Sequence, residues 1–285
     1  MIQASQLKVL ARRIAAQHQT SVQVVLQLHM MEVLLARIAA SPYRNNFVLK
    51  GGFLISSLIG VRNRTTMDLD ATAVGLPVNV ASIKRVFVRL CSSASCDEPV
   101  FSVVSVSDIR ESDDYGGVRV ALECRYGMLV IPMKFDVTAG DAITPGSVEH
   151  EHVSLLDGRV LRLPAYNVET LLAEKIETVL SRSIQNTRMR DFYDIHVLTR
   201  GRKPAIALPV LAEALNRTAA YRHSSGFLSQ AKEIIAMIRG DAEMARRWEN
   251  YRRTYSYADN LEFSEVCASL RHVFERLAVL LDGVA

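Results

Sequence analysis

The strongest constraint on the fold is a change in the spacing of apolar residues along the chain. Between about residues 65 and 137, the segments "TMDLDATAV", "VFSVVSVSDI", "GVRVALECRYG" and "MLVIPMKFDVTAG" are rich in β-branched residues and alternate with a period of two. This alternation is typical of half-buried strands. The first forty residues and the chain after Asn167 have helical spacing instead. One helical segment, "NVASIKRVFVRLCSSA", interrupts the strands.

These patterns predict an α+β fold, and "NNFVLK" adds another short strand before the main group. We expect a mixed sheet of about five strands flanked by helices, followed by a helical C-terminal part. The boundary is expected at "LRLPAYN", where Pro164 would break the last strand. The predicted domains are therefore residues 1–163 and 164–285. Near the N-terminus, Thr20 and Gln23 fit a capping box for the second helix.

Composition excludes several classes of protein. The chain has 285 residues, 49% of them hydrophobic and 22% charged, which are ordinary values for a globular protein. We expect no membrane association, because no apolar run approaches the roughly 20 residues that span a bilayer. The four cysteines form no C-x-x-C pair, so free thiols and a cytoplasmic location are expected. The net charge of +4 suits an anionic partner but is too common to identify one.

Two aspartates stand out in the first strand of the main group. Asp68 and Asp70 flank Leu69, and alternate residues of a strand share one face. Two carboxylates placed so close together repel each other unless a cation or a proton lies between them. Mg²⁺ often binds through one or two carboxylates plus substrate phosphates. A solvated pair at a sheet edge also explains D-x-D, so this motif alone does not establish a metal site.

Two further features favour phosphate chemistry. Gly51 and Gly52 stand between a strand and a helix, where backbone N–H groups can approach an anion, although a glycine pair is also an ordinary tight turn. Asp136, in "MKFDVTAG", adds a third carboxylate on a neighbouring strand, and Lys134 shares its face. Three acids beside a glycine turn are the equipment of metal-assisted phosphoryl or nucleotidyl transfer.

Three segments together resemble the AbiEii/MenT nucleotidyltransferase-like toxins, which belong to the polymerase-β-type superfamily. They are "FVLKGGFLISSLIGVRNRTTMDLDAT", "PMKFDVTAG" and "LLAEKIETVLSRSIQNTRMRDFYDIHVL". The resemblance spans about residues 47–198 and includes the glycine turn, the D-x-D strand, the "EK" helix and the "RDFYD" helix start, in the family's order. Phe53 departs from the pattern, because the family usually has a small hydroxyl residue after the glycines. Here Ser56 and Ser57 come later.

The resemblance assigns roles to individual residues. It implies a site made by Asp68, Asp70, Lys175 and Asp191, with Asp68, Asp70 and Asp136 at the metal and Gly51, Gly52, Ser56 and Lys175 at the nucleotide. Without the family, Lys175 would be interpreted as a surface lysine beside an apolar stripe. Asp194 shares a helix face with Asp191 and is expected to be structural.

The family also implies a function. We expect a toxin of a toxin–antitoxin or abortive-infection system, with a separately encoded antitoxin as partner. It would use an NTP with Mg²⁺ or Mn²⁺ and transfer the nucleoside monophosphate to an RNA acceptor, the tRNA 3′ end. One alternative is a small-molecule nucleotidyltransferase of the antibiotic-modifying kind. Another is a non-catalytic scaffold that binds nucleic acid or a partner protein.

Basic residues in the C-terminal part bear on the acceptor. They are Arg182, Arg188, Arg190, the "RGRK" segment at 200–203, Arg246, Arg247, Arg252 and Arg253. Tyr251 and Tyr255 lie among the last group, so the array suits an RNA backbone with stacking on exposed bases. Solvated helix faces explain each cluster equally well. A metal site at His150 and His152 is a less favoured hypothesis.

Overall fold

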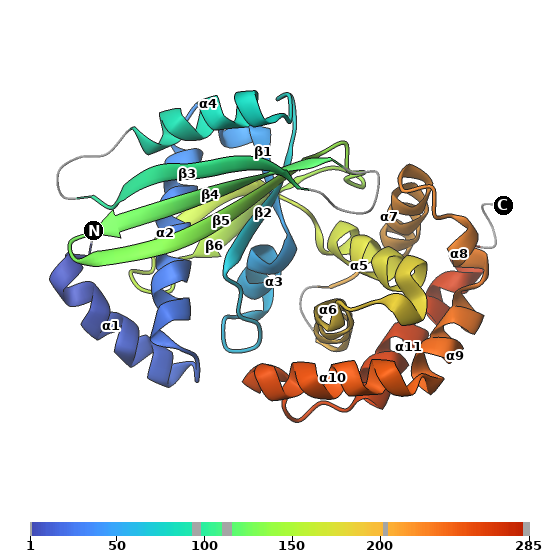
Figure 1. Cartoon of the computed structure of the whole chain (residues 1–285). Helices are drawn as coiled ribbons and strands as arrows, with labels where there is room; N and C mark the ends of the chain where they lie inside the picture. The colour runs from blue at the N-terminus through green and yellow to red at the C-terminus, as the bar shows by residue number, and fades with distance from the viewer. Residues whose placement is uncertain (1, 93–97, 110–115, 202–204, 282–285) are drawn as a thin grey trace. The chain divides into compact units, whose positions relative to one another are not determined.

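The structure is a computed structural model that describes residues 2–92, 98–109, 116–201 and 205–281 (Figure 1). The chain divides into two compact units. Unit 1 comprises Met1–Gly140 and Val148–Ala165, and unit 2 comprises Asp141–Ser147 and Tyr166–Ala285. Arg202 and Lys203 of the predicted basic segment, and Cys96, lie outside the described residues.

Unit 1 contains a mixed sheet, and the predicted α+β class is confirmed. Its strands are β1 (Phe47–Lys50), β2 (Asp68–Ala73), β3 (Val100–Ile109), β4 (Gly117–Tyr126), β5 (Leu129–Ala139), β6 (Val148–Val153) and β7 (Val160–Ala165). Their order is β3-β4-β5-β2-β1-β7-β6. The β2–β5 and β1–β7 pairs are parallel and the others are antiparallel.

The described residues therefore form seven strands instead of about five. The additional strands are β6 and β7, and for β7 the sequence predicted only an end at Pro164. In β6 the residues on the inner face are mainly histidines, so the alternation of hydrophobicity is weak in the sequence "VEHEHV". The expected break at Pro164 is wrong, because β7 continues to Ala165, which pairs with Val148. The predicted boundary between the domains 1–163 and 164–285 stays a prediction.

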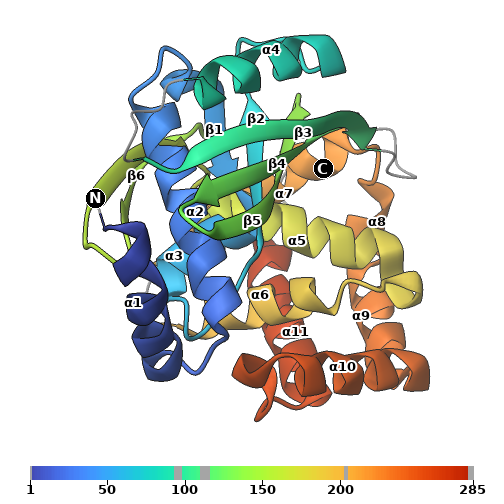
Figure 2. The ribbon, with the colours of Figure 1, turned by 60° about the vertical axis from the view of Figure 1, so that its left-hand side comes forward.

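One face of the sheet carries the core of unit 1. The rings of Phe47, Phe87 and Phe135 meet edge to face, with centroids 5.1 to 5.8 Å apart. Phe87 comes from α4 (Val80–Cys91), which lies along β3 in both views (Figures 1 and 2). The same face packs on α2 (Val22–Ala39), where the sulfur of Met30 lies 3.3 Å from that of Cys124. The opposite face is left for the polar residues of the strands.

Helix α2 follows α1 (Ala4–Gln17) and is a core helix. Its N-cap is Ser21, whose Oγ accepts from the Val24 backbone N–H at 3.2 Å, one residue after the predicted cap. We expected no apolar run long enough to span a membrane, and this is wrong for α2. Helix α2 is long and apolar enough to be a membrane span, but 72% of its 18 residues are buried inside the structure. A buried core helix has the same composition.

Unit 2 is helical in its described part. Its helices are α5 (Val168–Arg182), α6 (Met189–Arg200), α7 (Leu208–Tyr221), α8 (Gly226–Ser229), α9 (Ala231–Gly240), α10 (Ala242–Thr254) and α11 (Phe263–Leu281). Helix α5 begins at a side-chain cap, because Asn167 Oδ1 accepts from the Thr170 backbone N–H at 2.8 Å. The buried side chains of Phe192, Trp248 and Phe263 pack together at the centre of the α6, α10 and α11 helices.

Candidate functional site

Four charged residues form a row across the polar face of the unit 1 sheet. The strand register pairs Lys50 with Asp70, Asp70 with Asp136, and Asp136 with Arg119. Residues that pair across strands share a face, so the row contains two carboxylates between two basic residues. Asp68 lies on the same face, two residues before Asp70, and pairs with Lys134. The structure thus brings together the three carboxylates predicted from the sequence.

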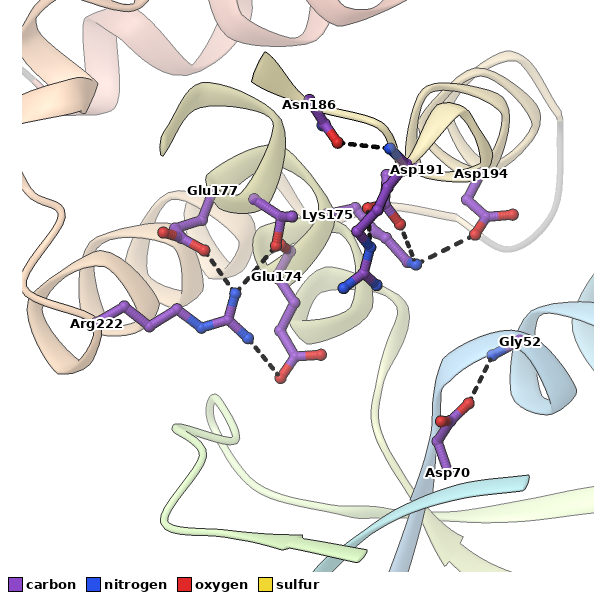
Figure 3. Close-up of polar contacts among 11 residues, drawn as sticks. Gly52, Asp70, Glu174, Lys175, Glu177, Asn186, Asp191, Asp194 and Arg222 are labelled. Atoms are coloured by element: carbon purple, nitrogen blue, oxygen red, sulfur yellow. Dashed lines mark hydrogen bonds and ion pairs between the residues drawn. The ribbon is translucent and has the colours of Figure 1, made fainter. Parts of the chain in front are cut away.

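Asp70 faces the glycine turn at the start of α3 (Gly51–Ile59). The Gly52 backbone N–H donates to Asp70 Oδ2 at 3.4 Å (Figure 3). Gly51 has a φ of +67°, and a Cβ atom at this position would lie 2.1 Å from Asp70 Oδ2. Gly51 is therefore required twice, by its left-handed backbone and by the close approach of the carboxylate. The glycine pair makes room for Asp70 at the N-terminus of α3.

Asp136 has a different partner. The Arg119 guanidinium donates from Nε to Asp136 Oδ1 at 2.8 Å and from Nη2 to Oδ2 at 2.6 Å. The hydrogen bond to Asp136 raises the pKa of Arg119; burial acts in the opposite direction, and the charges of Asp136, Asp68 and Asp70 add to the rise. Arg119 belongs to no motif, and the alternation of β4 places it on the polar face without identifying its partner.

The donor set suits a divalent ion that is completed by substrate. Asp68 and Asp70 project from one face of β2 and are both partly exposed. Mg²⁺ commonly uses one or two carboxylates and keeps its other positions for water and phosphate oxygens. Among the residues that the structure describes, no group of three or more His, Cys, Asp or Glu side chains is arranged around a metal position. A two-carboxylate site fits the residues present, and an all-protein cage does not.

The hydroxyl residues near the turn have distinct surroundings. Ser56 is only 3% exposed, inside α3, and its predicted contact with nucleotide stays a prediction. Ser57 Oγ lies 2.8 Å from His150 Nε2 and 2.7 Å from His152 Nδ1. Thr66 is the hydroxyl residue beside the turn, because a Cβ on Gly52 would lie 2.8 Å from Thr66 Oγ1. In the sequence, Thr66 stands two residues before Asp68.

The histidines of β6 belong to a buried network. His152 Nε2 pairs with Glu32 Oε1 of α2 at 2.9 Å, and Ser154 Oγ donates to Glu32 Oε2 at 2.6 Å. Burial and the neighbouring His152 lower the pKa of His150, while Glu151 opposes them. Both histidines already have polar partners within the protein. The network explains them without the metal considered from the sequence.

Lys175 lies in a second charged cluster, inside unit 2 (Figure 3). Its Nζ is 2.5 Å from Asp191 Oδ1 and 3.3 Å from Asp194 Oδ2. Arg188 Nε lies 2.9 Å from Asp191 Oδ2. The lysine side chain is 12% exposed, and the two carboxylates are exposed by 1% or less. Lys175 is therefore much more buried than the surface lysine that its position beside an apolar stripe would suggest.

The charge of Lys175 is maintained by its neighbours. Burial would lower the pKa of its ammonium, but Asp191 and Asp194 outweigh burial and the repulsion from Arg188, so the pKa is raised. Asp191 reaches this position from the first turn of α6. The α6 start is held by Asn186 Oδ1, which accepts from the Arg188 backbone N–H at 2.8 Å. The sequence assigned Asp191 to the site and predicted a structural role for Asp194. Both aspartates contact the Lys175 ammonium, so these contacts do not distinguish the two roles.

Helix α10 carries four arginines of the predicted RNA-binding array. Each of the four pairs with a glutamate of the same helix: Arg246 and Arg247 with Glu243, at 2.5 and 3.1 Å, and Arg252 and Arg253 with Glu249, at 2.6 and 2.8 Å. Arg252 also pairs with Glu262 at 2.6 Å. Four arginines against these three glutamates still leave a surplus positive charge.

The tyrosines of the same array pack against one another. The ring centroids of Tyr251 and Tyr255 are 4.7 Å apart, and Tyr255 stacks on Tyr257 with centroids 5.4 Å apart. Arg190 Nη2 donates to the Tyr255 hydroxyl at 3.0 Å. Tyr251 is only 9% exposed. Tyr251 therefore belongs to the helical core, while Tyr255 and Tyr257 are half-buried and packed against it. This differs from the exposed stacking surface that the sequence predicted.

Comparisons with known proteins place this geometry in context. The family model for the nucleotidyl transferase AbiEii toxin of type IV toxin–antitoxin systems matches residues 33–276. A putative nucleotidyltransferase from H. pylori is 16% identical, with a TM-score of 0.51 over 93% of this chain and 99% of its own. JHP933 from Helicobacter pylori is 16% identical, with a TM-score of 0.50 over 93% and 97%.

A nucleotidyltransferase toxin, MenT4 from Mycobacterium tuberculosis, is 17% identical and has a TM-score of 0.48 over 95% of this chain and 98% of its own. A search of curated proteins gave no match. At 16% identity the two H. pylori structures support the fold alone, and the family match is the finding that bears on activity.

Proposed function

The chain belongs to the AbiEii family of nucleotidyltransferase toxins, and on that premise we propose that it transfers a nucleoside monophosphate from an NTP to RNA. In this reaction an acceptor hydroxyl bonds to the α-phosphorus, pyrophosphate leaves, and the hydroxyl proton is released. The tRNA 3′ end is the proposed acceptor. The toxin would act in the cytoplasm, and its family implies a separate antitoxin as partner.

The observation that carries the proposal is the placement of Asp70 at the glycine turn. Asp68 and Asp70 would hold Mg²⁺, which neutralises phosphate charge and makes the α-phosphorus easier to attack. Gly51 and Gly52 bring the N-terminus of α3 within hydrogen-bonding reach of Asp70. Backbone N–H groups at a helix N-terminus favour phosphate. The position of the turn therefore supports a phosphate site beside the carboxylates proposed to hold the metal.

Lys175 is the proposed contact for the triphosphate. Its raised pKa keeps the ammonium charged at neutral pH. An ammonium has three N–H donors, and this one faces two carboxylates, so a donor is left for a phosphate oxygen. Asp191 and Asp194 would hold the lysine in one rotamer, which limits the entropy lost when the nucleotide binds.

An RNA acceptor is supported by the surplus charge of α10. Surface ion pairs contribute little stability, so the arginines can exchange their glutamate partners for RNA phosphates. Arg188 and Arg190 are poorer probes of this contact. Arg188 pairs with Asp191, and Arg190 bonds to Tyr255, so changing them would disturb the Lys175 cluster or the tyrosine packing.

The experiment incubates purified protein with each α-labelled NTP, Mg²⁺ and total tRNA. We expect label on tRNA with the wild-type protein and background label with Asp68→Asn or Asp70→Asn. Asp157→Asn is the matched control, because Asp157 is another partly buried carboxylate of unit 1 whose partner is Arg159. Unchanged labelling in both site variants would refute the metal assignment.

A companion titration tests the acceptor. Arg246→Glu with Arg253→Glu should weaken tRNA labelling and flatten its dependence on salt, since fewer counterions are released on binding. The control variant carries Arg12→Glu and Arg13→Glu on exposed positions of α1, which change the net charge equally. Label found only on a small amine would support the antibiotic-modifying alternative instead.

A further inference from the structure

The carboxylates of the sheet face have partners on opposite sides. Asp70 and Asp136 are direct neighbours on the parallel strands β2 and β5. Asp70 Oδ2 accepts from Gly52, which follows β1, whereas both oxygens of Asp136 accept from Arg119 on β4. In the strand order β4-β5-β2-β1, the partner of Asp136 comes from the β4 side and the partner of Asp70 follows strand β1 on the other side. The two neighbouring carboxylates therefore have different protein partners.

The Arg119–Asp136 pair is well suited to persist. The two residues are register partners on adjacent antiparallel strands, so the backbone already places them side by side. The contact is bidentate, at 2.8 and 2.6 Å, which adds energy and directional specificity to an ordinary ion pair. The Asp136 side chain is 18% exposed and that of Arg119 is 45% exposed. Water therefore competes mainly for the guanidinium.

Resting on the proposed function, we infer that Arg119 is a positioning residue that takes Asp136 out of the metal site. Asp68 and Asp70 then hold a single divalent ion, and the guanidinium stands where a second cation would otherwise be needed. In this inference Asp136 is not a metal ligand, which is the role that the sequence resemblance implied.

The charge balance of the face supports a single ion. Lys50, Lys134 and Arg119 pair by register with Asp70, Asp68 and Asp136, so the six residues are already neutral together. One divalent ion would leave the face with surplus positive charge for a triphosphate. Without Arg119, Asp136 would face Asp70 uncompensated, and the repulsion between them would favour a second ion.

The experiment titrates Mn²⁺ into the full-length protein and follows free Mn²⁺ by electron paramagnetic resonance, with and without a non-hydrolysable NTP analogue. We expect the wild type to bind one ion and Asp136→Asn to bind one ion with unchanged Kd. Arg119→Gln frees a carboxylate, so it should bind a second ion or bind the first roughly tenfold more tightly. Arg119→Lys keeps the charge and should keep the single ion.

The matched control is Arg125→Gln. Arg125 lies on the same strand and face as Arg119, and its partner is Glu123 at 2.7 Å, so the variant loses the same charge away from the proposed metal site. We expect wild-type Mn²⁺ binding, and thermal melting checks that each variant is folded. A wild type that binds two ions, or a large weakening in Asp136→Asn, would show that Asp136 is a ligand and overturn the inference.

The same titration separates this inference from the proposed function. If Asp68→Asn and Asp70→Asn both bind Mn²⁺ as the wild type does, the metal site itself is wrong and the role of Arg119 falls with it. If those two variants lose the ion while Asp136→Asn also loses it, the metal site stands and only the role of Arg119 is refuted.

Discussion

The charged face of unit 1 and the Lys175 cluster of unit 2 use the same kinds of side chain in different surroundings. On the sheet, Asp136 is 18% exposed and its partner Arg119 is 45% exposed. In unit 2, Asp191 and Asp194 are exposed by 1% or less and Lys175 by 12%. Asp68 and Asp70 on the same face are also partly exposed, so an external cation can reach them without breaking the Arg119–Asp136 pair. The buried charges of unit 2 depend on the partners they have.

This difference separates two roles that sequence motifs cannot distinguish. Both regions contain aspartates at short spacing, Asp68 and Asp70 in one and Asp191 and Asp194 in the other. The sheet pair is open to an external cation, whereas the helix pair already encloses an internal one. We therefore expect substitutions in the first region to reduce ligand binding alone, and substitutions in the second to reduce stability as well.

The largest expected effect on the free energy of unfolding is at Lys175. Lys175→Met would remove the ammonium that pairs with two buried carboxylates, of which Asp191 keeps its contact with Arg188. Removing one partner of a buried ion pair costs about 3–5 kcal/mol. Urea unfolding at pH 7 measures the change. Asp68→Asn is the comparison from the open face, and it should change the free energy of unfolding by less than about 1 kcal/mol. Equal effects in the two variants would contradict the distinction between the regions.

The next largest expected effect on stability is at Glu32, a buried acid of unit 1. Burial alone would raise its pKa, but His152, His29, Ser154 and the Leu155 N–H together outweigh burial and lower the pKa to about 2. Since the folded pKa lies below the unfolded value, the stabilisation is present above about pH 4.5 and is lost as the pH falls toward 2.

The lowered pKa of Glu32 corresponds to roughly 3 kcal/mol of stability at neutral pH. Urea midpoints measured between pH 2 and 6 should fall steeply on the acid side in the wild type. Glu32→Gln should be less stable at pH 6 and should flatten that dependence. If the urea midpoint of Glu32→Gln falls at low pH as steeply as that of the wild type, groups other than Glu32 control the loss of stability in acid.

The smallest effect on stability is expected at the glycine turn. Gly51→Ala should destabilise the protein by about 1–3 kcal/mol, because alanine is strained in the left-handed region and would collide with Asp70. Gly158→Ala is the control, since Gly158 has nearly the same φ, +68° against +67°, but open space around it. The excess loss at Gly51 measures the close approach of Asp70. Mn²⁺ binding should weaken only in Gly51→Ala.

Much of the fold was predictable from local patterns. The period-two segments became strands β2 to β5, and the helical spacing after Asn167 became the helices of unit 2. Strand β6 was not among the predicted strands, because histidines take inward positions in β6 that apolar residues usually occupy. For β7 only an end at Pro164 was predicted. The cap of α2 was misplaced by one residue, since Thr20 and Ser21 are both good caps and the sequence does not choose between them.

The sequence alone determined which residues could share a face. Asp68 and Asp70 project together because any strand alternates its side chains, and the family motifs located the glycine turn, Lys175 and Asp191. Only the tertiary structure decided which charges meet. Arg119 reaches Asp136 through the β4–β5 register, and Asp70 reaches Gly52 across 18 residues of chain. Alternation is a local property of the backbone, whereas register depends on how distant segments pack.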